Sequence, residues 1–189
     1  MSIRKITLVI AMTASAYLLL FGLNDYLFSF LGYSNGVTWI FLPSGLRLMF
    51  VLLFVEWGAV GIALASMTVS YLFQFEGNLL TLLGAGVISG FAPWLARRIS
   101  IDKLDLDVNL KDLTAVTLIR ISVLFAVLSA VLHQFWYTWR GQTESFVKST
   151  AVMAIGDLAG TIVVLYAVKS IMTMLVPYVM GATPDTMSK

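Results

Sequence analysis

Residues 37–74 form an almost unbroken apolar run, and this run is the strongest constraint on how the chain can fold. Only Arg47 and the triplet at 56–58 interrupt it. As a single helix the run would be about 57 Å long at 1.5 Å per residue, nearly twice the hydrocarbon thickness of a bilayer. We therefore expect two antiparallel membrane-spanning helices joined by a tight turn at Glu56, Trp57 and Gly58.

The rest of the chain has the same character. Of its 189 residues, 59% are apolar and only 12% are charged, a composition outside that of soluble globular proteins. A spanning helix needs about 20 mostly apolar residues, so the length allows about six spans and no soluble domain of ordinary size. The sequence predicts an all-α, single-domain transmembrane bundle within residues 1–189, with spans at 6–23, 37–55, 57–74, 78–96, 113–134 and 149–168.

The basic residues predict the orientation of this bundle. Cytoplasmic loops carry the excess of Lys and Arg, so the side with more of them is expected to face inward. The first run lacks a small-x-small cleavage site and is interpreted as a retained span rather than a signal peptide. Both termini are then expected in the cytoplasm, with Arg4, Lys5, Arg97, Arg98, Lys103, Lys111, Lys169 and Lys189 inside and only Arg140 and Lys148 outside.

Several function classes are disfavoured by composition. The chain has no cysteine, so thiol catalysis and Cys-ligated metals are excluded, and its formal charge of +2 is spread over topogenic residues, so nucleic acid is not an expected partner. No nucleophile and base arrangement or phosphate loop is present. We expect no enzyme activity, no cofactor and no metal. The aspartates Asp102, Asp105, Asp107 and Asp112 lack the glycine and glutamate of an EF-hand and are interpreted as a solvated connector.

Asp157 lies well inside the last apolar run. An acidic side chain near the bilayer centre costs about 2.5 to 3.5 kcal/mol, so such a residue normally has a partner or a function. Two arginines also fall inside spans. Counting about 1.5 Å per residue, Arg47 lies at nearly the depth of Asp157, whereas Arg120 lies roughly 8 Å further in and can extend to the inner headgroups. The sequence predicts a buried Arg47–Asp157 pair, with Arg120 as a secondary candidate.

The segment from Trp39 through Pro43, Ser44 and Gly45 to Arg47 predicts an irregular helix start. Proline favours the first turn of a helix and disfavours an interior position, so a helix could begin near Pro43 within the bilayer. Its free N–H groups and positive dipole end would then form a site for a small anionic ligand beside Arg47. The alternative is an ordinary proline kink whose arginine is satisfied by Asp157.

Two further features are candidates for other roles. His133 is the single histidine, and it precedes an aromatic cluster typical of a membrane interface, where it could contact a ligand or respond to pH. Small residues at four-residue spacing, Ala11 with Ser15 and Gly156 with Gly160, predict close helix packing.

Two stretches together resemble a known family. The run from Trp39 to Leu46, with Pro43, Ser44 and Gly45, resembles a signature of the bacterial membrane-associated sensor domains of the first type, in the MASE family. The run from Gly156 to Gly160 resembles their glycine-aspartate signature. The resemblance implies a multi-pass sensory module in the bacterial inner membrane that signals to a separate membrane or cytoplasmic protein. This chain differs from the family in having six expected spans rather than about eight.

Two alternatives remain open at this point. The length, the expected six spans and the small residues Ala11 and Ser15 are also similar to the substrate-binding subunits of energy-coupling factor transporters, which dock on a transport module. A membrane assembly or scaffold protein without a small ligand is the other alternative, and in that case the buried charges are purely structural.

Overall fold

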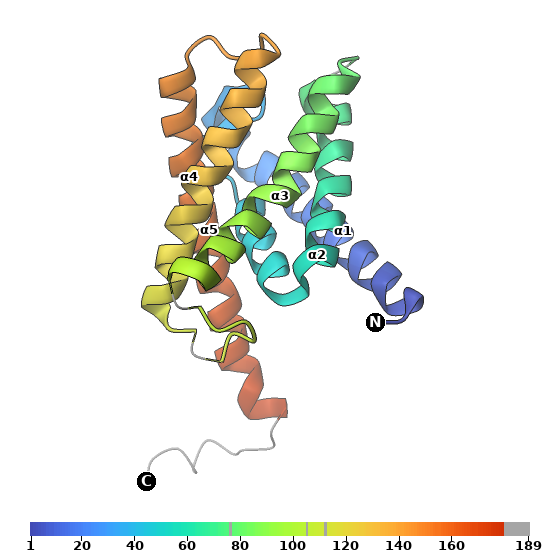
Figure 1. Ribbon diagram of the computed structural model, residues 1–189, viewed down its shortest axis with the longest axis vertical. Coiled ribbons are helices and arrows are strands. Elements are labelled where there is room, and N and C mark those ends of the chain that lie inside the picture. The colour runs from blue at the N-terminus through green and yellow to red at the C-terminus, as the bar shows by residue number, and fades with distance from the viewer. Residues whose placement is uncertain (76, 105, 112, 180–189) are drawn as a thin grey trace.

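The chain folds into a bundle of long helices, shown by a computed structural model that describes all residues except 76, 105, 112 and 180–189. Within the described residues, five helical segments are long and apolar enough to cross a membrane. They contain α1 (Ile3–Phe28), α2 (Pro43–Val69), α3 (Leu79–Lys103), α4 (Ala115–Trp139) and α5 (Phe146–Val179). Figure 1 shows them lying side by side, with α1 strongly inclined to the others.

The first correction concerns residues 37–42, which were expected to belong to a spanning helix. They are not helical: two short antiparallel strands, β1 (Gly32–Ser34) and β2 (Val37–Thr38), form a hairpin, and the chain then runs irregularly to Pro43. Pro43 occupies the first turn of α2, where a missing N–H costs least. The buried Asn24 side chain accepts a 2.8 Å hydrogen bond from the N–H of Leu42 and so fixes the point where α2 begins.

Residues 37–74 do contain two antiparallel helical parts, as expected, but the turn between them lies at Val55 rather than at Glu56, Trp57 and Gly58. The chain reverses at Val55, whose φ of 50° and ψ of −117° lie outside the helical region. Because of this reversal, Arg47 and Ser66 both hydrogen-bond to Ser89 of α3, although they lie on opposite sides of the break. The first half of α2, residues 43–54, is only about 18 Å long, so it can cross a bilayer only together with the irregular segment that leads to it from the hairpin. The second half continues into the π-helix η2 (Ser70–Gln74) and is long enough.

Val55 offers a direct test of this reversal. Its dihedral angles match the first central position of a type II′ turn, which glycine adopts readily and a β-branched residue does not. We expect Val55→Gly to raise the free energy of unfolding by about 1 kcal/mol, because it relieves this strain. Val60→Gly, in the helical second half of α2, is the matched control and is expected to lower it by about 0.5–1 kcal/mol. Reversible unfolding in mixed micelles measures both, and an equal loss in the two variants would contradict the turn.

The connections differ from the expected solvated loops in one respect. After α3, Leu106 is 4% exposed and packs into the hydrophobic core with Leu48 and Phe125. Arg97 Nη2 donates to the carbonyl of Val108, which holds this connection against the end of α3. Asp105 and Asp112 lie outside the described residues. At the other end of the sequence, α5 continues as a helix beyond the expected span, to Val179.

The central element is α2, which contacts all four other long helices. Glycines on α3 allow a close contact with α2, since a Cβ at Gly90 would meet the backbone of Ala59 and one at Gly86 would meet Met67. Large apolar side chains such as Leu19 and Val87 are exposed on the outside of the bundle, as expected of surfaces that face lipid. Arg47, on the first half of α2, is thereby placed in the middle of the structure.

Candidate functional site

Arg47 and Asp157 meet in the interior of the bundle. Arg47 Nη1 lies 3.7 Å from Asp157 Oδ2, and both side chains are 1% exposed. Arg47 follows the start of α2 by one turn, and Asp157 lies in α5 next to Gly156. The two sequence stretches that carry the family resemblance therefore lie against each other.

The irregular segment before α2 is held directly against α5. The N–H of Phe41 donates a 3.1 Å hydrogen bond to the carbonyl of Gly156. A Cβ at Gly156 would meet the carbonyl oxygen of Thr38, and a Cβ at Gly160 would meet that of Phe41. The two glycines do allow a close approach, but the partner is non-helical backbone and not the helix that was expected.

The first turn of α2 is fully engaged with protein. Ser44 Oγ lies 2.7 Å from the carbonyl oxygen of Asp157 and 3.1 Å from Thr161 Oγ1. The N–H groups of Ser44 and Gly45 donate to the carbonyls of Phe41 and Leu42. The N–H groups expected to bind an anion are therefore occupied within the fold. A Cβ at Gly45 would lie 2.5 Å from Cβ of Val164, so this position also serves contact with α5.

Buried serines surround the guanidinium group. Arg47 Nε donates to the carbonyl of Ser89 at 3.1 Å, and Nη2 donates to Ser129 Oγ at 3.1 Å. The Arg47 Cζ lies 5.2 Å from the ring centroid of Phe125, within range of a cation–π contact. Ser66 Oγ in turn donates to Ser89 Oγ at 2.8 Å. Sequence reasoning missed these serines, although polar side chains inside apolar helices are the signal that points to them.

His133 belongs to the same cluster in the interior of the bundle, whereas its aromatic sequence surroundings were interpreted as typical of a membrane interface. It is 2% exposed, with Nε2 3.2 Å from Ser89 Oγ and Nδ1 2.8 Å from the carbonyl of Ser129. His133 therefore links the Ser129 carbonyl of α4 to Ser89 of α3. The carbonyl of Ser89 in turn accepts the hydrogen bond from Arg47 Nε.

The Asp157 carboxylate is the least satisfied group of the cluster. Neither Oδ1 nor Oδ2 accepts a hydrogen bond from any residue that the structure describes. Its 3.7 Å separation from Arg47 is longer than the roughly 2.7–2.9 Å of a charge-assisted hydrogen bond. A buried carboxylate without donors is costly, so this group has capacity for a further donor.

A small polar cavity of about 20 Å³ lies beside Arg47. By volume it can hold about one water-sized group. Its walls come from every long helix and from the segment before α2. They include Tyr17, Phe41, Arg47, Ser66, Gln74, Ser89, His133, Tyr137 and Met153.

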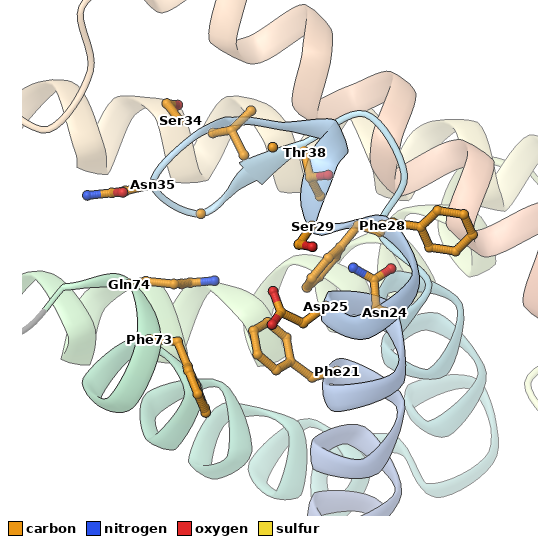
Figure 2. A pocket seen from close by; sticks show the side chains of 14 residues that line it. Phe21, Asn24, Asp25, Phe28, Ser29, Ser34, Asn35, Thr38, Phe73 and Gln74 are labelled. Carbon is orange, nitrogen blue, oxygen red and sulfur yellow. The ribbon is translucent and has the colours of Figure 1, made fainter.

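A larger pocket of about 200 Å³ adjoins this central cavity, and we call it the hairpin pocket because the β1–β2 hairpin forms one wall. Gly36, Phe41 and Gln74 line both spaces. Figure 2 shows Asp25 pointing into the hairpin pocket between Phe21 and Gln74, with Ser29 nearby. These shared residues place the hairpin pocket directly beside the cavity next to Arg47.

The other candidate residues lie apart from this cluster. Arg120 is exposed on α4, and Trp39 is 43% exposed. Ala11 and Ser15 are exposed on α1, so they do not provide the close packing within the bundle that their spacing predicted. Within the described residues, no group of three or more His, Asp or Glu side chains is placed to hold a metal ion.

Comparisons with known proteins leave the site to be interpreted from its own geometry. No protein-family model, curated protein or solved structure matches this chain. The likeness to membrane-associated sensor domains therefore stays a prediction from the sequence.

Proposed function

We propose that this chain is a multi-pass sensory or ligand-binding module of a membrane, and that it reports its occupancy to a separate protein partner. In this proposal the protein lies in a bacterial inner membrane with both termini in the cytoplasm. The ligand enters through the hairpin pocket from the opposite side. The Arg47–Asp157 pair is the element that responds.

One observation carries the proposal. The buried Asp157 carboxylate lacks hydrogen-bond donors in the described structure, while its partner Arg47 lines a polar cavity that adjoins the hairpin pocket. A pair that served only to hold two helices together would gain from close hydrogen-bonded geometry. A pair held at 3.7 Å can instead exchange partners when a polar group arrives.

The connection between ligand and pair runs through residues 36–42. Phe41 lines both spaces and its N–H donates to Gly156, the residue before Asp157. Asn24, next to Asp25, holds the N–H of Leu42. A ligand that moves Asn24 or Phe41 would shift the backbone that supports Asp157, which gives the two-state element that a sensor needs.

A second candidate is a substrate-binding subunit of an energy-coupling factor transporter. Exposure of Ala11 and Ser15 on α1 favours it, because small residues on an outward helix face permit close docking of another membrane protein. The two candidates differ in the partner, which would be a signalling protein in one and a transport module in the other.

Native mass spectrometry of the full chain extracted from its membrane tests the proposal. We expect the wild-type protein to retain a small-molecule adduct, and we expect Asp157→Asn and Arg47→Gln to lose it, because each removes one half of the responding pair. The mass of a co-purifying subunit would distinguish a signalling partner from a transport module.

Arg120→Gln is the matched control, since it removes an exposed arginine from the same bundle. It is expected to keep the adduct. Retention of the adduct in all three folded variants would contradict a ligand-linked role for the pair. Absence of any adduct across several growth conditions would favour the scaffold alternative.

A further inference from the structure

The hairpin pocket has a distinctive charge. Asp25 is the one charged residue among those that line it, and its side chain is exposed to the pocket. Among the residues that the structure describes, no Lys or Arg nitrogen lies within 4 Å of this carboxylate. The pocket therefore presents a negative charge that the described part of the chain does not neutralise.

Aromatic rings form much of the remaining wall. Phe21, Phe28, Phe41 and Phe73 all line the pocket. The ring centroids of Phe21 and Phe73 are 5.6 Å apart, and those of Phe21 and Phe41 are 6.4 Å apart, so the three rings form a continuous surface. Aromatic faces attract cations through the ring quadrupole, and this is the usual way in which proteins recognise quaternary ammonium groups.

The volume and the polar lining of the hairpin pocket further restrict the class of ligand that it can bind. The volume of about 200 Å³ is below the roughly 300–1,000 Å³ of pockets for drug-sized molecules, so the ligand is small. Ser29 and Gln74 add a hydroxyl and an amide group to the lining. Figure 2 shows the Gln74 amide directed toward the space in front of Asp25. These groups suit a hydroxyl or carbonyl carried by the same small molecule.

We infer that the hairpin pocket binds a small organic cation, such as a primary amine or a quaternary ammonium compound with a polar tail. The Asp25 carboxylate supplies the counter-charge, and the rings of Phe21 and Phe73 contact the cation. The inference rests on the proposed function, because it names the class of ligand that enters toward the central cavity.

Equilibrium binding of choline to the full chain in lipid nanodiscs tests the inference. The neutral isostere 3,3-dimethylbutan-1-ol has the same shape without the charge. We expect saturable choline binding and at least about tenfold weaker binding of the neutral alcohol, since the charge interacts with both Asp25 and the rings. Asp25→Asn is expected to weaken choline binding by about tenfold or more and to leave the binding of the alcohol nearly unchanged.

Two matched controls make the test specific. Asp102→Asn removes an exposed carboxylate near the C-terminal end of α3 that does not line the hairpin pocket, and Phe30→Leu removes a 77% exposed ring outside it. Both are expected to bind choline as the wild type does, whereas Phe73→Leu is expected to bind it several-fold more weakly. Gel filtration and circular dichroism verify that each variant is folded.

The outcomes separate this inference from the proposed function. Equal binding of choline and the neutral alcohol, an equal loss in Asp102→Asn and Asp25→Asn, or no saturable choline binding would overturn the inference. Retention of some other molecule that depends on Asp157 would then still support the proposed function. Choline binding that depends on Asp25 but is unaffected by Asp157→Asn supports the inference while contradicting the link to the buried pair.

Discussion

Arg47→Met is expected to lower the free energy of unfolding by about 3–5 kcal/mol, because it leaves the Asp157 carboxylate buried without its counter-charge. The side chain of Asp157 is 1% exposed and accepts no hydrogen bond from the described residues, so Arg47 is its main compensating group. The substitution also removes the hydrogen bonds from Arg47 to Ser89 and Ser129. Reversible unfolding by SDS in mixed micelles measures the change.

The double variant Arg47→Met with Asp157→Leu separates the pair from its surroundings. Replacing both charges with apolar side chains is often nearly neutral in other buried pairs, so we expect the double variant to be more stable than Arg47→Met alone by about 1–2 kcal/mol. Arg120→Met, at an exposed position on α4, is the control and is expected to change stability by less than about 0.5 kcal/mol. Strictly additive losses in the double variant would show that the two charges do not act as a unit.

The long helices and the location of the pair could be predicted from the sequence for simple physical reasons. Apolar runs of sufficient length specify spanning helices, because a lipid environment leaves the backbone few alternatives. Depth along each run then places Arg47 and Asp157 at a similar level. In the structure, Arg47 Nη1 and Asp157 Oδ2 lie 3.7 Å apart.

The irregular segment at 37–42 could not be predicted in the same way. Hydropathy does not distinguish a helix from an extended chain when neighbouring residues satisfy the backbone. Here Asn24 and Gly156 do so, and both are distant in sequence from the segment. The glycine spacing on α5 signalled a close approach, but it carried no information on whether helix or extended chain would fill it.

The serine cluster and the hairpin pocket were even harder to predict from the sequence, because each forms only when distant segments of the chain come together. Ser66, Ser89 and Ser129 lie on three different helices, and although each is a polar residue inside an apolar helix, its sequence context does not show that the three meet. In the sequence, Asp25 follows closely after the first expected span, 6–23. Its position opposite Phe73 follows only from the reversal at Val55, which returns η2 to the end of α1.

Gly160→Ala is expected to lower the free energy of unfolding by about 2–3 kcal/mol, through overpacking. The added Cβ would meet the carbonyl oxygen of Phe41, a backbone atom that cannot rotate away as a side chain can. The loss should exceed the gain of about 1 kcal/mol that alanine normally brings to a helix. The displaced Phe41 would also lose its hydrogen bond to Gly156, so its amide is expected to exchange faster with deuterium.

Gly22→Ala provides the matched control for this substitution. Gly22 is also helical, but a Cβ there would have nothing within 4 Å. It is expected to raise stability by up to about 1 kcal/mol through helix propensity alone. Opposite signs at the two glycines would show that Gly160 is required for the contact between α5 and the irregular segment. A gain of similar size at both positions would mean that this segment can move away from α5 at little cost, and the proposed path from the hairpin pocket to Asp157 would then lack its rigid connection.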